Sequence, residues 1–406
     1  MNIYYHTLSN GIRVVHKEKN SDVSFCGIMI ATGSKDEKED EHGITHLIEH
    51  TLFKGTKKRK AYHILSYMEN VGGEINAYTT KEETCIHTSF YNNYYERSLE
   101  LLSDILYNSI FPEIEIEKEK KVIIDEINSY RDTPIELIYD DFEEKVFAGN
   151  PIGRNVLGSE ESLKNITRGK ILSFIKRNYP TDQTIISSVG NIKFDKLVKL
   201  VEKYFGKVPP KKYIDSKIVD INYKPFQLSI KKNTHQSHCI IGNVAYDVKH
   251  PDRFAMLLLN NIIGGPGMNS RLNVLLREKN AFAYNIDSNY TAYNNTGIFT
   301  VYFGTDSKNL ERSIKLIVRE FEKFQEKPLT NLQLNKAKRQ LIGQIAIASE
   351  NSEHSMLTMA KSCLVYNKVF TINEIKSFIE SVTPEQICRI ASEVLNVNKL
   401  SYLIYK

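Results

Sequence analysis

The chain has 406 residues, of which 41% are hydrophobic and 25% are charged, a balance typical of a globular protein with a sizeable core. This composition excludes a wholly disordered chain, and the length suggests two or three domains. The net charge of +5 is too small to indicate nucleic-acid binding unless the basic residues cluster.

The beginning of the chain and its cysteines bear on location. The opening run MNIYYHTLSNGIRVVHK lacks the basic start and unbroken apolar stretch of a secretory signal. No segment reaches the ~20 apolar residues that span a bilayer. The 5 cysteines are scattered without a CxxC pair, which favours reduced, buried thiols over a disulfide framework. We therefore expect a cytoplasmic protein that makes no membrane contact.

The first half of the chain predicts mixed strands and helices. The apolar run Cys26–Ala31 is typical of a buried strand. The elements that follow are predicted to be helices Gly43–Lys54 and Lys60–Val71, strands Glu74–Thr80 and Glu83–Phe90, helices Tyr94–Ile110, Glu115–Arg131 and Thr167–Asn178, strand Thr184–Val189 and helix Phe194–Phe205.

The second half repeats this order with different residues. It predicts strand His238–Ala245, helices Asp252–Ile263 and Asn269–Lys279, strands Phe282–Tyr293 and Ile298–Phe303, several helices including Ser307–Gln325 and Leu332–Ser349, and the closing strand LSYLIY. Between the halves, Pro209 and Pro210 cannot continue a helix. We expect an N-terminal domain over 1–208, a linker over 209–222 and a homologous C-terminal domain over 223–406, in an α+β fold.

The segment HGITHLIEHTLFKG carries a candidate metal motif. Residues three and four apart share a helix face, so His46, Glu49 and His50 are predicted to be neighbours. Two imidazoles one turn apart can bind one metal ion, and Glu49 can reach a water beside it. This HxxEH pattern is the inverse of HExxH. A chance match, or a buried histidine pair bonded to backbone groups, gives the same letters.

A third ligand would separate these alternatives, because a catalytic zinc site uses three protein ligands and keeps its fourth position for water. The segment EIEIEKEKKVIIDEINSYR places Glu119 and Glu126 two helical turns apart on one face. Glu126 follows the apolar run VIID, where a carboxylate requires a partner. A metal ion is one such partner.

Three runs together carry a specific resemblance. GSKDEKEDEHGITHLIEHTLFKGTKKR, NVGGEINAYTTKEET and EKEKKVIIDEI resemble the pitrilysin family of HxxEH zinc peptidases, also called inverzincins. The closest likeness is to the short-chain branch that includes mitochondrial processing peptidase and its bacterial relatives. The similarity extends through PIGRNVLGSEESLKNIT and SVTPEQICRIA to nearly the whole chain.

The resemblance implies a fold and a metal site. The fold is that of the LuxS/MPP-like metallohydrolases, with two homologous α/β-roll-like domains, each a mainly antiparallel sheet packed against helices. The site is one Zn²⁺ per chain bound by His46, His50 and Glu126, with Glu49 as general base. Glu119 is implied as a supporting residue beside the ligands. The matching segment of the second half, FAMLLLNNIIGG, has no such residues.

The resemblance also implies substrate-binding residues. Asn76 and Ala77, in GEINAYTT, match a strand that contacts the substrate, although this strand could equally be an internal one. Arg277 and Tyr284, in NSRLNVLLREKNAFAYNI, match an arginine and tyrosine that contact substrate and stabilise the oxyanion. Without the family context, a surface arginine and a core tyrosine would explain the same pair.

The expected function is zinc-dependent endopeptidase activity on short or unfolded peptides inside a dimeric chamber. A chain with both the zinc motif and the Arg277–Tyr284 pair suits a homodimer. The alternative is a non-catalytic assembly subunit of the same family, which intact motif residues disfavour. Nucleic-acid binding through the basic run Lys54–Lys60 is a further alternative, but this run reads better as a solvated turn.

Overall fold

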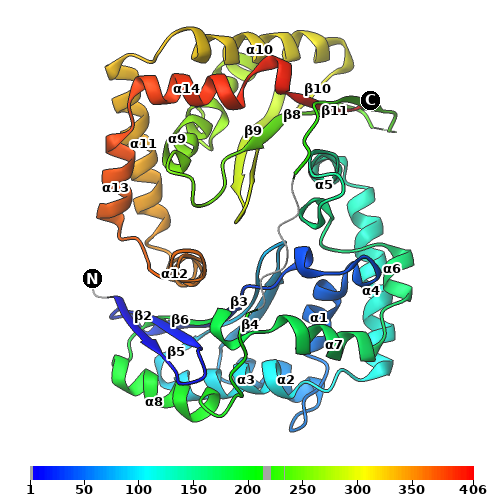
Figure 1. Ribbon diagram of the computed structural model, residues 1–406, viewed down its shortest axis with the longest axis vertical. Helices are drawn as coiled ribbons and strands as arrows, with labels where there is room; N and C mark the ends of the chain where they lie inside the picture. The colour runs from blue at the N-terminus through cyan, green and yellow to red at the C-terminus, as the bar shows by residue number, and fades with distance from the viewer. Residues whose placement is uncertain (1–2, 214–220, 233) are drawn as a thin grey trace. The chain divides into compact units, whose positions relative to one another are not determined.

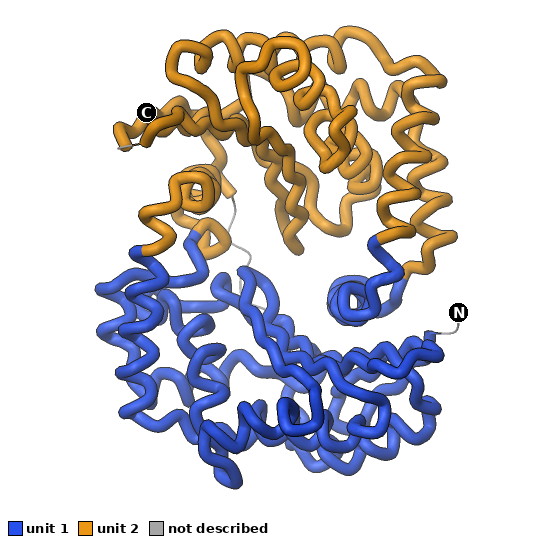
Figure 2. The backbone as a smooth tube through the Cα atoms, turned by 180° about the vertical axis from the view of Figure 1, so that it is seen from behind, with its two compact units in different colours: residues 1–128, 154–217, 348–369 blue, residues 129–153, 218–347, 370–406 orange. Residues whose placement is uncertain are grey.

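The computed structural model describes residues 3–213, 221–232 and 234–406. The chain forms two compact units, drawn in different colours in Figure 2. Unit 1 contains residues 1–128, 154–217 and 348–369, and unit 2 contains residues 129–153, 218–347 and 370–406. Each unit therefore includes a segment from the opposite half of the sequence.

Unit 1 is built on a sheet of six strands within the described residues. These are β1 (Ile3–Thr7), β2 (Arg13–Glu18), β3 (Val23–Ile30), β4 (Glu74–Thr79), β5 (Thr84–Tyr91) and β6 (Thr184–Gly190). Their order is β1-β2-β6-β3-β5-β4. Neighbours run antiparallel except β2 and β6, which are parallel. This order leaves β4 at one edge of the sheet.

Helices cover one face of this sheet, as Figure 1 shows. They are α1 (Ile44–Leu52), α2 (Ala61–Glu69), α3 (Tyr95–Asn108), α6 (Glu160–Lys164), α7 (Arg168–Asn178) and α8 (Phe194–Phe205), together with α4 (Glu113–Arg131), whose last residues belong to unit 2. Alternate strand side chains such as Ile86 and Phe90 point into the core that these helices close. The remaining strand positions face the other side.

The other face of the unit 1 sheet is covered by α12 (Ser352–Tyr366). Met356 and Cys363 on this helix pack against Met29, Cys85 and Val189 of the strands. The sheet is therefore buried on both faces, which explains why its central strands read as near-continuous apolar runs.

Unit 2 has a five-stranded sheet within the described residues. Its strands are β7 (Gln227–Ile230), β8 (Ser237–Ala245), β9 (Ala283–Ala292), β10 (Gly297–Thr305) and β11 (Ser401–Tyr405), in the order β7-β11-β8-β10-β9. One face packs against α9 (Arg253–Gly264), α10 (Leu310–Glu326), α11 (Asn331–Ala348), α13 (Ile372–Ser381) and α14 (Pro384–Val394). The opposite face receives α5 (Pro134–Val146), whose Phe142 packs near Tyr302 and Leu403.

The predicted fold class is confirmed: both units are mainly antiparallel sheets packed against helices. Most predicted elements occur within a few residues of the expected bounds, and α8 matches them fully. The predicted helix Asn269–Lys279 is instead largely a π-helix, over Asn273–Glu278. Within the predicted linker, residues 214–220 lie outside the described residues.

None of the helices among the described residues combines the length and apolar composition that crossing a bilayer requires.

Candidate metal centre

Helix α1 holds the HxxEH motif because its two faces differ. Ile44, Leu47 and Ile48 are fully buried in the core of unit 1. The other face carries His46 and His50, whose ring centroids lie 4.6 Å apart. The predicted one-turn neighbours are therefore side by side, with the orientation fixed by the apolar residues between them.

Helix α4 brings a carboxylate to the same place. Its own apolar residues Ile116, Ile123 and Ile127 are buried in the unit 1 core, which turns the Glu119 and Glu126 face toward α1. The Glu126 Oε2 atom lies 3.9 Å from His46 Nε2 and 3.8 Å from His50 Nε2. In the described part of the chain, this trio is the group whose donor atoms converge closely enough to hold a metal ion, all within 4.8 Å of one another.

The donor set fits zinc. Two imidazole nitrogens and one carboxylate oxygen form one of the ligand combinations used by catalytic zinc sites. The two separations from Glu126, 3.9 Å to His46 and 3.8 Å to His50, exceed by a few tenths of an ångström the roughly 3.3–3.6 Å expected between donors at ordinary zinc distances in a tetrahedron. Burial, together with the neighbouring His50, lowers the pKa of His46 to about 4. His46 is therefore neutral near pH 7, the form that binds metal.

Glu119 and Lys54 lie behind the ligands. The Glu119 Oε2 atom is 3.0 Å from His50 Nδ1, and the Lys54 ammonium is 2.7 Å from the other carboxylate oxygen, Oε1. Although burial acts to raise the pKa of Glu119, its bonds to Lys54 and His50 lower it overall. The anionic Glu119 thus accepts a hydrogen bond from the Nδ1–H group of His50, and Nε2 of the same ring is left free to bind a metal ion.

Glu49 lies beside the ligands on α1. Its Oε2 atom is buried and has no hydrogen-bond partner. Burial raises the pKa of Glu49, an effect that the Thr79 hydroxyl and His50 oppose. Thr79 ends the edge strand β4, and α1 contacts that strand. The Glu49 carboxyl group therefore lies near both the metal ligands and the end of β4.

Asn76 and Ala77 lie in the middle of this edge strand. They pair with His87 and Ile86 of β5, so the opposite backbone edge of β4 has no neighbouring strand in the described residues. Ala77 packs against the core that includes α1, and Asn76 points to the other face. An extended peptide can bond to such an edge through its main chain.

Arg277 and Tyr284 come together in unit 2. Arg277 lies in the π-helix and Tyr284 near the start of β9. The guanidinium carbon is 5.1 Å from the centre of the tyrosine ring, and 74% of Tyr284 is exposed. The arginine is therefore stacked on an accessible phenol ring rather than isolated on the surface, and Tyr284 is not a core residue.

Sequence reasoning missed Lys54 as part of the centre. The sequence predicts a solvated turn over Lys54–Lys60, yet Lys54 bonds to Glu119 and Arg59 bonds to Asp104, each at 2.7 Å. The available signal was the position of Lys54 one turn after His50, which places its long side chain near the same carboxylate.

Comparison with known proteins agrees with this geometry. The family model described as Insulinase (Peptidase family M16) matches residues 13–160, and the model described as Peptidase M16 inactive domain matches residues 165–341. The first match contains His46, Glu49, His50 and Glu126. The second contains Arg277 and Tyr284.

Related sequences span nearly the whole chain. A Rickettsia felis protein named uncharacterized zinc protease is 31% identical over 98% of this chain and 96% of its own length. The Bacillus subtilis protein named uncharacterized zinc protease YmxG is 30% identical over 96% and 95%. The probable mitochondrial-processing peptidase subunit beta of Schizosaccharomyces pombe is 29% identical over 96% and 88%.

Solved structures share the fold. A protease from Helicobacter pylori superposes with a TM-score of 0.89 at 22% identity, covering 100% of this chain and 99% of that one. A Pseudomonas fluorescens protein described as a peptidase M16 inactive domain gives 0.90 at 20% identity, covering 100% and 98%. The fold and the HxxEH helix thus define a protein of the zinc-protease type. The chain belongs to peptidase family M16, and the resemblance to its short-chain members is confirmed.

Proposed function

We propose that the chain is a zinc-dependent endopeptidase that cleaves short or unfolded peptides. The convergence of His46, His50 and Glu126, with the Glu49 carboxyl beside them, carries this proposal. The names of the relatives, which are zinc proteases and a processing-peptidase subunit, support the same chemistry.

Each residue has a defined part in the proposed reaction. A zinc ion held by His46, His50 and Glu126 would supply a Lewis acid that polarises the peptide carbonyl and acidifies water. Glu49 takes a proton from the attacking water and returns it to the leaving amine. Arg277 and Tyr284 donate hydrogen bonds to the substrate carbonyl as negative charge develops on its oxygen.

The edge strand β4 accounts for the proposed substrate class. Main-chain hydrogen bonds to β4, near Asn76 and Ala77, require an extended peptide and read little of its sequence. Most strands of a folded domain already bond to their neighbours and its edge strands are usually protected, whereas a short or unfolded peptide leaves its whole backbone free to pair. We propose that the chain works as a homodimer in which a chamber encloses such peptides.

Metal content and peptide cleavage, measured on the same preparations, test the proposal. We expect Glu49→Gln to keep its zinc but to lose about 10²–10⁴-fold in kcat on a quenched-fluorescence peptide library. Glu126→Gln should lose both zinc and activity. Asp125→Asn is the matched control, because Asp125 is the exposed neighbour of Glu126 on α4. A wild-type protein that cleaves peptides equally well after removal of all divalent ions would contradict the proposal.

A further inference from the structure

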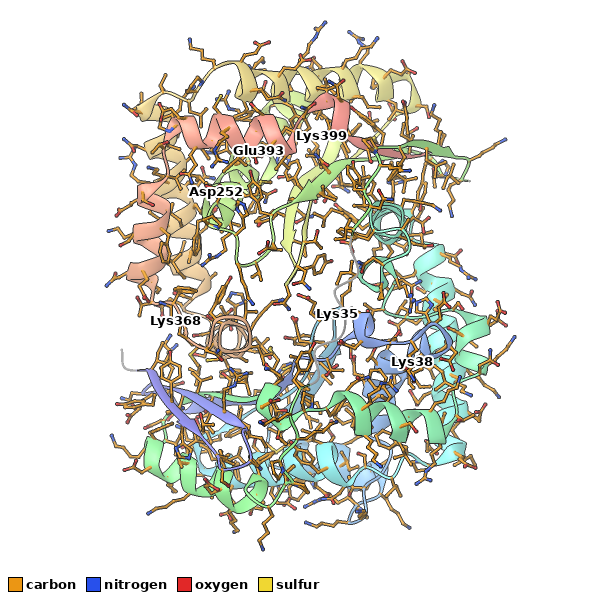
Figure 3. The ribbon with its side chains drawn as sticks, viewed as in Figure 1. Lys35, Lys38, Asp252, Lys368, Glu393 and Lys399 are labelled. Carbon is orange, nitrogen blue, oxygen red and sulfur yellow. The ribbon has the colours of Figure 1, made fainter. Side chains whose placement is uncertain are left out.

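The start of α1 is held by a carboxylate from outside the helix. The N-cap residue Gly43 has no side chain to bond the first backbone N–H groups, and its φ of 88° is left-handed. Glu37 supplies the missing acceptor: its Oε2 accepts from Gly43 N at 2.8 Å and its Oε1 from Thr45 N at 2.9 Å. The Thr45 hydroxyl also donates to Oε1. Figure 3 labels Lys35 and Lys38, which lie on either side of Glu37 in the chain.

Glu37 is more deeply buried than a residue that only caps a helix needs to be. Glu37 is only 4% exposed. Burial acts to raise its pKa, whereas the hydrogen bonds from Thr45 and Gly43 and the charge of Arg154 favour the ionised carboxylate. An acidic group kept in such a place costs the fold free energy, and groups of this kind concentrate at functional sites. The groups that donate hydrogen bonds to Glu37 belong to Gly43 and Thr45, which shortly precede His46 in the chain.

A second segment, Arg154–Gly158, holds the same turn from the outside. The Arg154 guanidinium donates to the backbone oxygens of Glu37 at 3.2 Å and Lys38 at 3.3 Å. Gly158 packs so tightly on Gly43 that a Cβ on either glycine would lie 2.8–2.9 Å from backbone atoms of the other residue or its neighbour. This segment lies within the run PIGRNVLGSEESLKNIT, which has no part in the proposed chemistry.

We propose that Glu37 is a positioning residue that fixes the first turn of α1, and thereby the His46 imidazole, for metal binding, with Arg154 and the Gly43–Gly158 contact holding Glu37 and the turn in place. The inference rests on the proposed zinc site. His46 needs such support because its Nδ1 atom is buried without a hydrogen-bond partner, whereas His50 is oriented by Glu119. The direction of the His46 ring therefore depends on its backbone and on the side chains packed around it rather than on a hydrogen bond at Nδ1.

The test measures zinc affinity rather than activity. In Glu37→Gln one of the two carboxylate oxygens becomes an amide NH₂ group. This group cannot accept a hydrogen bond, so it faces either the Gly43 or the Thr45 backbone N–H group with no bond between them. We expect this variant to bind Zn²⁺ about tenfold more weakly in competition with a chromophoric chelator. The Co²⁺-loaded variant should also show an altered visible absorption spectrum, because the ligand geometry around the ion changes. Arg154→Met, a milder change outside the cap, should weaken Zn²⁺ binding in the same direction.

The matched control is Asp104→Asn, which removes another buried carboxylate of unit 1, one that accepts from Thr56 and Arg59. It should lower the unfolding midpoint of the metal-free protein and leave both zinc affinity and the Co²⁺ spectrum unchanged. Parental zinc affinity in both Glu37→Gln and Arg154→Met would overturn the positioning role and leave the proposed function standing. A wild-type protein that binds no Zn²⁺ in the same titration would overturn both.

Discussion

Lys54 and His50 bond to the same carboxylate, that of Glu119. The Lys54 ammonium and the His50 ring share the two oxygens of Glu119, so each helps to fix the carboxylate for the other. Groups of this kind, which touch a ligand but not the metal, set the tautomer and direction of the ligand ring. A lysine in a basic run is thus part of the metal centre.

Replacing Lys54 tests this dependence. We expect Lys54→Met to weaken Zn²⁺ binding by about tenfold, because Glu119 loses its charge partner and holds His50 less firmly. Lys54→Arg should retain most of the affinity, since it keeps the charge. Lys58→Met, in the same basic run but 63% exposed, is the control and should bind zinc as the parent does. Equal affinity in all three variants would show that Glu119 holds His50 without Lys54.

His16 links the pH to the stability of unit 1. It is fully buried, and burial lowers its pKa from the ordinary 6.5. Below pH 6.5 the unfolded chain takes up a proton at this histidine that the folded chain does not. The contribution of His16 to the free energy of unfolding is therefore complete above pH 6.5 and declines as the pH falls below it.

The predicted loss of stability at low pH can be measured in the zinc-free protein. We expect the thermal unfolding midpoint to fall between pH 7 and pH 5, and to fall less in His16→Gln, which cannot bind the proton. His46 also has a lowered pKa, so part of the decline should remain in the variant. The same decline in both proteins would contradict this role for His16.

At the scale of elements, α12 is the clearest case of a helix whose place its own sequence does not reveal. Its apolar residues indicate a buried face but not which sheet that face covers. Met356 is fully buried against the unit 1 sheet, close to Gly27, where a Cβ would lie 3.0 Å from the Met356 sulfur. Gly27 on β3 thus leaves the space that the long side chain of Met356 on α12 fills.

The packing of α12 on the unit 1 sheet predicts that shortening a buried side chain of this helix lowers the stability of the protein. We expect Met356→Ala to lower the free energy of unfolding by about 2–5 kcal/mol in urea titrations, because it opens a cavity beneath the helix. Ile347→Ala, on α11 and 77% exposed, should change it by no more than about 0.5 kcal/mol. A small effect at Met356 would mean that α12 adds little to the stability of the sheet.

For the whole molecule, local patterns predicted most of the elements, including the metal-binding helix, but not β1, β2 or α5. The spacing of His46, Glu49 and His50 fixes their shared face in any helix, so their proximity follows from geometry alone. The choice of Glu126 as the third ligand depended on the family resemblance, because several other carboxylates lie in the same segment.

Other features depend on contacts between distant parts of the chain. The carboxylate of Glu37 caps a helix that begins several residues later, and its sequence around GSKDE gives no sign of burial. Helices α5 and α12 each pack in the unit formed mainly by the other half. An amphipathic helix specifies that it must be buried, and the choice of partner is made by the whole fold.

The split of the proposed functional residues between unit 1 and unit 2 leads to a prediction about assembly. Glu49→Gln removes the general base, and Arg277→Ala removes an oxyanion donor while leaving the metal ligands intact. If the chain is a homodimer whose Arg277 and Tyr284 complete the partner's site, mixed dimers contain one site with both residues unchanged. We expect a co-refolded mixture to regain up to about one quarter of wild-type peptidase activity when exchange is complete, because half the dimers are mixed and each has one intact site of two. Activity no higher than that of the separate variants, with exchange confirmed by differently tagged chains, would place the pair in the same chain as the base it serves.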